Sequence, residues 1–317
     1  MRKVFITRKL VGKAEQMLKE KGFQVKIYKE DCPIPREEFL KNTANADALI
    51  SLLTDKIDRE VIDNLKKCKI IANCAVGYNN IDVEYARSKN IIVTNTPEIL
   101  TDATADLTVA LILACARRLH EGESMMRTNQ FSGWKPQLLL GLEMKGKKVG
   151  IIGAGRIGYA AAKRLYAFGT EIIYFDRERR MNFENEFNAK KVTLNTLIKS
   201  ADFISVHLPL SKDTFHLLNK TNLKLMKETS LIVNTSRGEV IEEKSLIELL
   251  KKKKIFAAGF DVYEGEPNIN HELAKLENVF LLPHIGSATI ETRSAMAELC
   301  AKNAIRVLSG EKPVTPV

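Results

Sequence analysis

The sequence has 317 residues, of which 45% are hydrophobic and 28% are charged, and its formal net charge is +10. This length predicts two domains, and the composition is typical of soluble globular proteins. There is no apolar run long enough to span a membrane and no signal-peptide pattern at Met1–Thr7, so we expect a cytoplasmic protein with no membrane partner. The lysines are dispersed along the chain, which argues against a nucleic-acid partner.

Strand-like apolar runs alternate with helical stretches over the first hundred residues. The predicted strands here are Val4–Thr7, Val25–Tyr28, Ala48–Ser51, Ile70–Asn73 and Ile91–Thr94. This alternation is typical of a parallel sheet with crossover helices.

A long helix rich in alanine and leucine is predicted next, over Thr101–Leu119. It is apolar on more than one face, so we expect the rest of the chain or a second copy of it to bury the helix. Another helix is predicted over Thr289–Leu308, after the last strand of a second series.

That second series of strands predicts a second α/β domain. It begins at Val149 and continues through Ile172–Tyr174, Phe203–Val206, Leu231–Asn234, Phe256–Phe260 and Val279–Leu282. The predicted fold class is therefore α/β, with two Rossmann-like, doubly wound parallel-sheet domains.

A glycine-rich turn follows the first strand of this series. Gly153 permits a tight turn, Gly155 lets the main chain approach a pyrophosphate, and Gly158 lets the following helix pack close to the strand. The N-terminus of that helix offers N–H donors to phosphate oxygens. Asp176 follows the next strand, where a carboxylate can accept a ribose 2′-hydroxyl, so the segment predicts a dinucleotide site.

The form of the dinucleotide is less strongly indicated. Asp176 favours NAD(H), because a carboxylate repels a 2′-phosphate. However, Arg177, Arg179 and Arg180 follow directly, and an arginine can hold the phosphate of NADP(H). We therefore expect NAD(H) to be preferred and leave NADP(H) open.

Three polar residues lie after strands of the second series, at the sheet edge where α/β proteins bind ligands: Arg237, Glu266 and His284. Reduction of a 2-oxo acid needs donors for the carboxylate and carbonyl, an acid for the developing alkoxide, and a carboxylate that keeps this acid charged and oriented. An arginine, a histidine and a glutamate match these three requirements.

With these motifs in this order, the sequence resembles the D-isomer-specific 2-hydroxyacid dehydrogenases over nearly its whole length. The motifs that carry the resemblance are Gly153–Gly158, Asn234–Gly238, Gly259–Val262, Glu266-Pro267 and Pro283–Thr289. The resemblance implies hydride transfer at a nicotinamide, with His284 as acid and base, Glu266 as its partner and Arg237 as the substrate clamp.

The resemblance also implies further cofactor contacts: Asp261 at the nicotinamide carboxamide, Thr104 at the phosphates, and the His207–Pro209 turn beside the adenine. The full predicted cofactor-binding set is Gly153, Gly155, Arg156, Ile157, Gly158, Asp176, Thr104, His207, Pro209, Thr235, Asp261 and Gly286.

In the first domain, Asn73–Asp82 looks like the family's substrate loop, so the resemblance implies that the N–H groups of Val76 and Gly77 meet the substrate carboxylate and that Leu53 flanks the substrate. Arg237 and His284 complete the predicted substrate set. The resemblance implies a substrate-binding domain of residues 1–98 and 289–317, a dinucleotide-binding domain of residues 99–288, and an active site in the cleft between them. It also implies a homodimer formed through about 101–140.

Within the family, Thr96–Leu107 and Gly133–Pro136 look most like glyoxylate and hydroxypyruvate reductases. Some members of that branch carry a second tryptophan where this sequence has Leu138, so the sequence does not predict selectivity for the smallest substrates. Three alternatives stay open: a short 3-phosphoglycerate dehydrogenase, a D-lactate-type dehydrogenase, and a non-catalytic NAD(H)-sensing protein of the corepressor type.

We expect no metal site, because no cluster has ligand spacing. The five cysteines form no C-x-x-C pair, and we expect buried free thiols.

Overall fold

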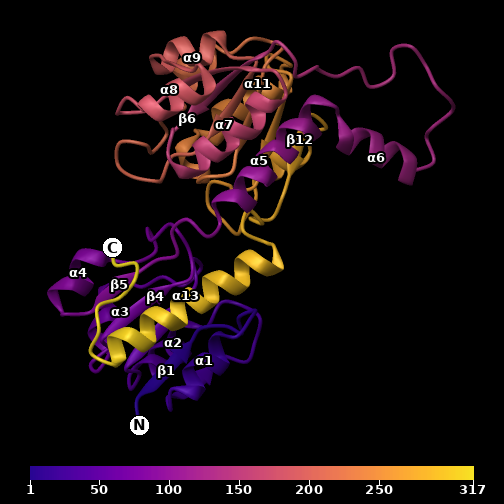
Figure 1. Ribbon diagram of the computed structural model, residues 1–317. Helices are drawn as coiled ribbons and strands as arrows, with labels where there is room; N and C mark the ends of the chain where they lie inside the picture. Colours follow the sequence, from indigo (N-terminus) through magenta and orange to yellow (C-terminus); the bar gives the residue numbers. More distant parts are fainter. The chain divides into compact units, whose positions relative to one another are not determined.

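The computed structural model describes residues 1–317 and divides into two compact units. Unit 1 comprises Met1–Leu100 and Ser287–Val317, and unit 2 comprises Thr101–Gly286. Each unit contains one sheet in which all strand pairs are parallel, and helices cover its faces (Figure 1). The predicted fold class, two parallel-sheet α/β domains, is confirmed.

Unit 1 has a five-stranded sheet with the strand order β2-β1-β3-β4-β5. Its strands are β1 (Lys3–Ile6), β2 (Gln24–Ile27), β3 (Ala48–Ser51), β4 (Ile70–Asn73) and β5 (Ile92–Thr94). Its helices are α1 (Ala14–Glu20), α2 (Arg36–Thr43), α3 (Arg59–Asn64), α4 (Val83–Ser88) and α13 (Ile290–Leu308).

The sheet of unit 1 is buried on both faces, which explains why β3 and β4 are uninterrupted runs of buried residues. One face packs against apolar side chains of α2, α3 and α4, such as Phe39, Val61 and Ala86. The other face packs against α1 and α13, with Leu18 and Ala301 in the same cluster. The last helix of the chain thus completes the unit that the first residues begin.

Unit 2 has a seven-stranded sheet with the order β12-β11-β10-β9-β6-β7-β8. Its strands are β6 (Lys148–Ile152), β7 (Glu171–Phe175), β8 (Lys190–Lys191), β9 (Phe203–Val206), β10 (Leu231–Asn234), β11 (Ala257–Phe260) and β12 (Val279–Leu281). Its helical segments are α5 (Thr101–Ala116), α6 (Leu119–Arg127), α7 (Arg156–Ala167), α8 (Met181–Phe187), α9 (Leu194–Ser200), α10 (Lys220–Leu223), the 3₁₀ turn η1 (Gly238–Val240), α11 (Glu243–Lys251) and α12 (His271–Ala274).

The strand order of unit 2 reverses direction beside β6. The chain runs outward from β6 to β7 and β8, and then returns to β9 on the other side of β6. In open α/β sheets, ligands bind outside the carboxyl ends of the strands at such a switch point. The register brings the last residues of β6, β9 and β10 to the same edge of the sheet.

Helix α5 is buried by its own chain, where it packs on α7 and on the strands β10, β11 and β12. It is shorter than predicted, because Arg118 adopts a left-handed backbone conformation (φ 53°) and α6 begins at Leu119 in a new direction. From there residues 119–143, here called the arm, project from the body of unit 2 (Figure 1). The arm leaves after Ala116 and returns beside it, where the N–H of Leu142 donates to the Ala116 carbonyl at 2.7 Å.

The expectation that the cysteines are buried was wrong for two of the five. Cys32 is exposed and Cys74 is half-buried, whereas Cys68, Cys115 and Cys300 are buried; all five thiols are free, as predicted. Strand β8 was not predicted, because its two lysines carry no apolar signal.

No helix is both long enough and apolar enough to cross a membrane.

Candidate active site

The glycine-rich turn between β6 and α7 has the geometry of a phosphate cradle. Gly153 has a φ of 95°, and a Cβ built there would lie 2.7 Å from the carbonyl oxygen of His207. A Cβ on Gly158 would lie 2.1 Å from the carbonyl oxygen of Gly153, so α7 starts in close contact with the turn. Gly155, the N-cap of α7, faces open space. This backbone path requires glycine at 153 and 158, and the open helix N-terminus suits an anion.

Asp176 follows β7 and lies beside this turn. Its Oδ2 accepts the N–H of Ala154 at 2.9 Å, and its Oδ1 accepts the N–H of Glu178 at 3.1 Å. The carboxylate is thereby fixed at the edge of the cradle, where a ribose hydroxyl could donate to it.

The three arginines after Asp176 are in different environments. Arg179 forms hydrogen bonds with both carboxylate oxygens of Glu184. Arg180 lies 3.5 Å from Asp176 Oδ1 and 3.2 Å from Glu178 Oε2. Arg177 is exposed and has no ion pair, so it is the arginine of this group whose guanidinium is free to meet a phosphate.

His207 lies directly after β9, against Gly153. Its Nε2 is 2.8 Å from Ser205 Oγ, while its Nδ1 is buried without a hydrogen-bond partner. Burial lowers the pKa of His207 to about 4, so the imidazole is neutral at physiological pH. Pro209 is exposed in the same turn, and its carbonyl accepts the hydroxyl of Thr214.

The other predicted cofactor residues lie around the ends of β10 and β11. The hydroxyls of Thr108 and Thr235 are 2.8 Å apart, and Thr104 donates to the Gly286 carbonyl at 3.1 Å. The buried carboxylate of Asp261 accepts the N–H groups of Ile285 and Gly286, both at 2.7 Å. Because these bonds occupy both oxygens of Asp261, its carboxylate holds the segment that carries His284. Arg156 and Ile157 form the first turn of α7.

The structure brings His284 and Glu266 together. Nδ1 of His284 lies 2.7 Å from Oε2 of Glu266, and Oε1 of Glu266 accepts the N–H of Tyr263 at 2.9 Å. Both side chains are about 30% exposed. Burial alone would raise the pKa of Glu266, but the hydrogen bond and charge of His284, with the Tyr263 N–H and the charge of Arg237, bring it below the usual value. Glu266 is thus an anion that orients the imidazole.

Arg237 follows β10 on a turn that Asn234 holds in place. The buried side chain of Asn234 donates to the Arg237 carbonyl at 2.8 Å and accepts the N–H of Ser236 at 3.0 Å. Burial lowers the pKa of Arg237, while the charges of Glu266 and Glu239 oppose this effect. A guanidinium in such a site remains charged.

Gly238 explains why this turn can approach the Glu266 loop. A Cβ on Gly238 would lie 1.9 Å from the carbonyl carbon of Tyr263, so no larger residue fits. The strand ends that carry Arg237 and Glu266 therefore pack in direct backbone contact.

The predicted substrate loop of unit 1 follows β4. Val76 and Gly77 are half-buried, and Leu53 is 40% exposed after β3, the neighbouring strand. The two loops are joined by Asn80, whose Nδ2 donates to the carbonyls of Leu52 and Asp55 at 3.1 and 2.9 Å. The sequence alone carries no signal for this role of Asn80.

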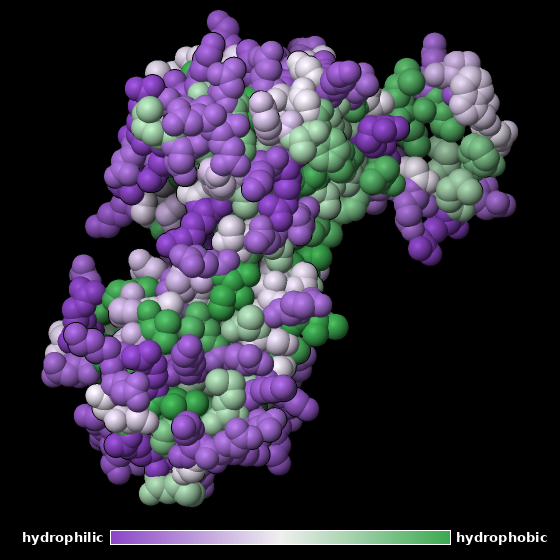
Figure 2. Space-filling view, viewed as in Figure 1, coloured by the Kyte–Doolittle hydropathy of each residue, from purple (hydrophilic) through white to green (hydrophobic).

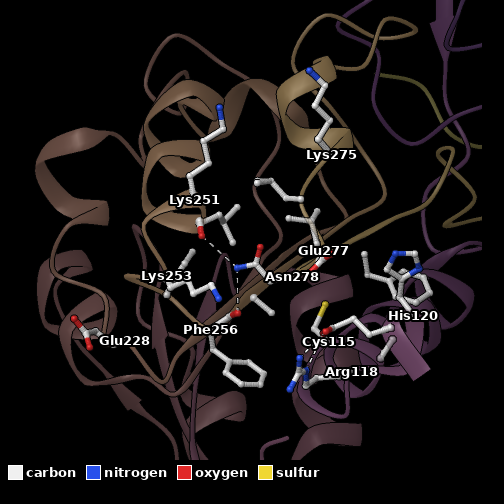
Figure 3. Close-up of a pocket in the computed structure, with 18 residues that line it drawn as sticks. Cys115, Arg118, His120, Glu228, Lys251, Lys253, Phe256, Lys275, Glu277 and Asn278 are labelled. Atoms are coloured by element: carbon white, nitrogen blue, oxygen red, sulfur yellow. Dashed lines mark hydrogen bonds and ion pairs between the residues drawn. The ribbon is translucent and has the colours of Figure 1, made fainter. Parts of the chain in front are cut away.

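A separate cavity of about 400 Å³ lies in unit 2, where β11 and β12 begin, at the opposite edge of the sheet from Arg237 and His284 (Figure 3). Its charged lining is largely paired: Arg118 bonds with Glu121, and Lys251 and Lys275 both pair with Glu272. None of the predicted site residues lines this cavity. No group of His, Cys, Asp or Glu is arranged to hold a metal ion.

Comparison with known proteins decides the family. The sequence model of the D-isomer specific 2-hydroxyacid dehydrogenase NAD binding domain matches residues 109–286, which is most of unit 2. The chain belongs to this dehydrogenase family. Its members are oxidoreductases, and unit 2 contains the family's NAD-binding domain.

Individual relatives agree over the full length. The chain is 49% identical to the glyoxylate reductase of Thermococcus litoralis over 98% of this chain and 95% of that protein. A solved structure from Thermus thermophilus is 42% identical, with a TM-score of 0.95 and 99% of both chains covered. The NADPH-dependent glyoxylate/hydroxypyruvate reductase of Sinorhizobium meliloti, solved with NADP and malonate, is 29% identical with a TM-score of 0.86, covering 100% of this chain and 96% of that one.

Proposed function

We propose that this dehydrogenase reduces small 2-oxo acids, glyoxylate or hydroxypyruvate first, to D-2-hydroxy acids with a nicotinamide dinucleotide. The observation that carries the proposal is the His284–Glu266 pair at 2.7 Å, in the unit that holds the glycine cradle. The names of the relatives support the choice of substrate, because they include glyoxylate reductases at 46–49% identity.

In this proposal the chain's own residues bind the substrate and move one proton. The guanidinium of Arg237 donates to the substrate carboxylate and carbonyl, and the N–H groups of Val76 and Gly77 donate to the carboxylate. His284 protonates the carbonyl oxygen through Nε2, because Nδ1 is engaged with Glu266. Glu266 stabilises the charged imidazole before that transfer. In the oxidation direction, His284 accepts the proton.

The structure fits the dinucleotide that the family uses. Gly153, Gly155 and Gly158 leave room for a pyrophosphate at the N-terminus of α7, and the orphaned Nδ1 of His207 offers a buried polar atom beside that turn. When bound, the dinucleotide supplies the hydride that reduces the carbonyl carbon. Thr104, Thr235, Asp261 and Gly286 belong to the proposed cofactor site with the residues of the cradle.

NAD(H) is the preferred form in this proposal. The fixed carboxylate of Asp176 accepts a ribose hydroxyl but repels a 2′-phosphate. Arg180 is paired with Asp176 and Glu178, and Arg179 with Glu184. Use of NADP(H) would therefore depend on Arg177.

We also propose a homodimer in which the arm packs against a second copy. No residue of the arm is buried, although it carries large apolar side chains that gather in one part of the surface (Figure 2). The most exposed of these are Leu119, Met126, Phe131, Trp134 and Leu140, at 47–81% of their surface. Such a patch is typical of a protein–protein interface.

Initial rates with four 2-oxo acids test the function. Glyoxylate, hydroxypyruvate, pyruvate and 3-phosphohydroxypyruvate are each offered with NADH and with NADPH. We expect the fastest turnover with glyoxylate or hydroxypyruvate and NADH. A preference for pyruvate or 3-phosphohydroxypyruvate would indicate a D-lactate-type or 3-phosphoglycerate dehydrogenase. Binding of NADH without any turnover would favour the non-catalytic sensor.

A further inference from the structure

Three consecutive carbonyls of the substrate loop accept hydrogen bonds from buried donors of unit 1. The Ala75 carbonyl accepts the N–H of Thr96 at 2.9 Å. The Val76 carbonyl accepts Nδ2 of Asn95 at 2.8 Å, and the Gly77 carbonyl accepts Nδ2 of Asn73 at 2.9 Å. Two of the three donors are thus side-chain amides.

These bonds determine where the N–H groups of the loop point. In a trans peptide the C=O and the N–H of the next residue lie in one plane and point in opposite directions. Holding the carbonyls of Ala75, Val76 and Gly77 inward therefore directs the N–H groups of Val76, Gly77 and Tyr78 away from the amides. None of these three N–H groups donates to another group of the chain.

The two amides are themselves fixed. Asn73, the last residue of β4, is fully buried, and its Oδ1 accepts the hydroxyl of Ser51 at 3.2 Å. Asn95 follows β5 and is 9% exposed. Its backbone N–H donates to the Thr315 carbonyl at 3.3 Å, and its carbonyl accepts the Thr315 hydroxyl at 2.7 Å. Buried amides with satisfied partners do not reorient easily, because an unpaired polar group inside a protein is costly.

We propose that Asn95 and Asn73 are positioning residues that preorganise the N–H groups of Gly77 and Tyr78 for an anion, beside the Val76 N–H that the Thr96 backbone orients, and that they set the preference for 2-oxo acids over neutral carbonyl compounds. The inference rests on the proposed function, in which this loop binds the substrate carboxylate. N–H donors held in place before binding need no reorganisation when the anion arrives. The amides do not touch the substrate; they act through the peptide planes.

Asn73→Leu and Asn95→Leu test the inference, because leucine is close to asparagine in size and has no donor. The matched control is Asn64→Leu. The side-chain amide of Asn64 also donates to a backbone carbonyl of unit 1, that of Leu40, at 2.6 Å, and this bond joins α3 to α2. For each variant, kcat/KM is measured with glyoxylate and with its neutral methyl ester, together with the Kd for NADH and the Tm. If leucine prevents folding, Asn73→Ala and Asn95→Ala are used instead.

We expect the ratio of kcat/KM for glyoxylate to that for the ester to fall roughly tenfold in the Asn73 and Asn95 variants, mostly through KM. The ratio should not change in the Asn64 variant, and NADH binding should be unchanged in all three. An equal loss with both substrates would overturn the inference, because a purely structural role weakens both reactions alike. A wild-type protein that does not reduce glyoxylate would instead contradict the proposed function, so the two failures are distinguishable.

Discussion

Nδ1 of His284 lies 2.7 Å from Oε2 of Glu266, and the other oxygen of that carboxylate accepts the N–H of Tyr263. Glu266 is therefore held by the backbone of its own loop while it holds the imidazole. Because Nδ1 is engaged, Nε2 is the nitrogen that remains to exchange a proton with a substrate.

Glu266→Gln should impair turnover without weakening NADH binding. The amide keeps the shape of the carboxylate but gives up the charge that stabilises the protonated imidazole. We expect kcat for glyoxylate reduction to fall by about 10²-fold, the lower end of what general acid catalysis contributes. The control is Glu264→Gln, because Glu264 pairs with His216 instead. Near-normal kcat in Glu266→Gln would contradict the role of this pair.

Asp176→Ser should shift the enzyme from NADH towards NADPH. Removing the carboxylate removes the acceptor for the ribose hydroxyl and leaves Arg177 and Arg180 to meet a phosphate. We expect the ratio of kcat/KM for NADH to that for NADPH to fall by about tenfold or more. Glu178→Ser, in the same loop, is the control. A wild-type enzyme selective for NADPH would show that Asp176 does not decide the cofactor.

The low pKa of His207 predicts a loss of stability in mild acid. The unfolded chain binds a proton on His207 below pH 6.5, whereas the folded state does so only near pH 4. The unfolded state therefore holds more protons between these values, and stability falls as the pH drops through this window. For a half-buried imidazole we expect the free energy of unfolding to fall by about 2 kcal/mol across this window.

Urea unfolding of wild type and His207→Gln between pH 4 and pH 7 measures this effect. The variant should show a flatter pH dependence, because glutamine does not titrate. Parallel curves for the two proteins would refute the assignment to His207.

Charges placed on the arm should dissociate the proposed dimer. Trp134 is 81% exposed and Leu140 is 62% exposed, so replacing both with glutamate should change the stability of the free chain little. In an apolar interface the two buried charges would strongly destabilise the dimer. We expect a monomeric mass by sedimentation velocity where wild type is dimeric. Phe215→Glu, another exposed aromatic residue (53%), should stay dimeric. A monomeric wild type would rule out the dimer.

The strands could be predicted because both sheets are buried on both faces, so runs such as Ala48–Ser51 are continuously apolar. The glycine turn was recognisable because its backbone path excludes side chains at Gly153 and Gly158. Other features depend on tertiary placement. The left-handed residue Arg118, which ends α5 early, has no sequence signal.

The same limit applies around the candidate site. Nothing local indicates that the amides of Asn73 and Asn95 bond to Gly77 and Val76, because these bonds form only when β4 and β5 lie side by side. Likewise, the sequence does not tell which of the three arginines after Asp176 could meet a phosphate, whereas the structure pairs Arg179 and Arg180 with carboxylates.

The most direct test of the account is the rate of glyoxylate reduction by His284→Asn, measured beside its affinity for NADH. We expect this variant to bind NADH as tightly as wild type does, because His284 is not in the proposed cofactor site. We expect it to lose nearly all turnover, because asparagine cannot replace the imidazole as the acid that protonates the substrate. Turnover close to that of wild type would contradict the proposed chemistry.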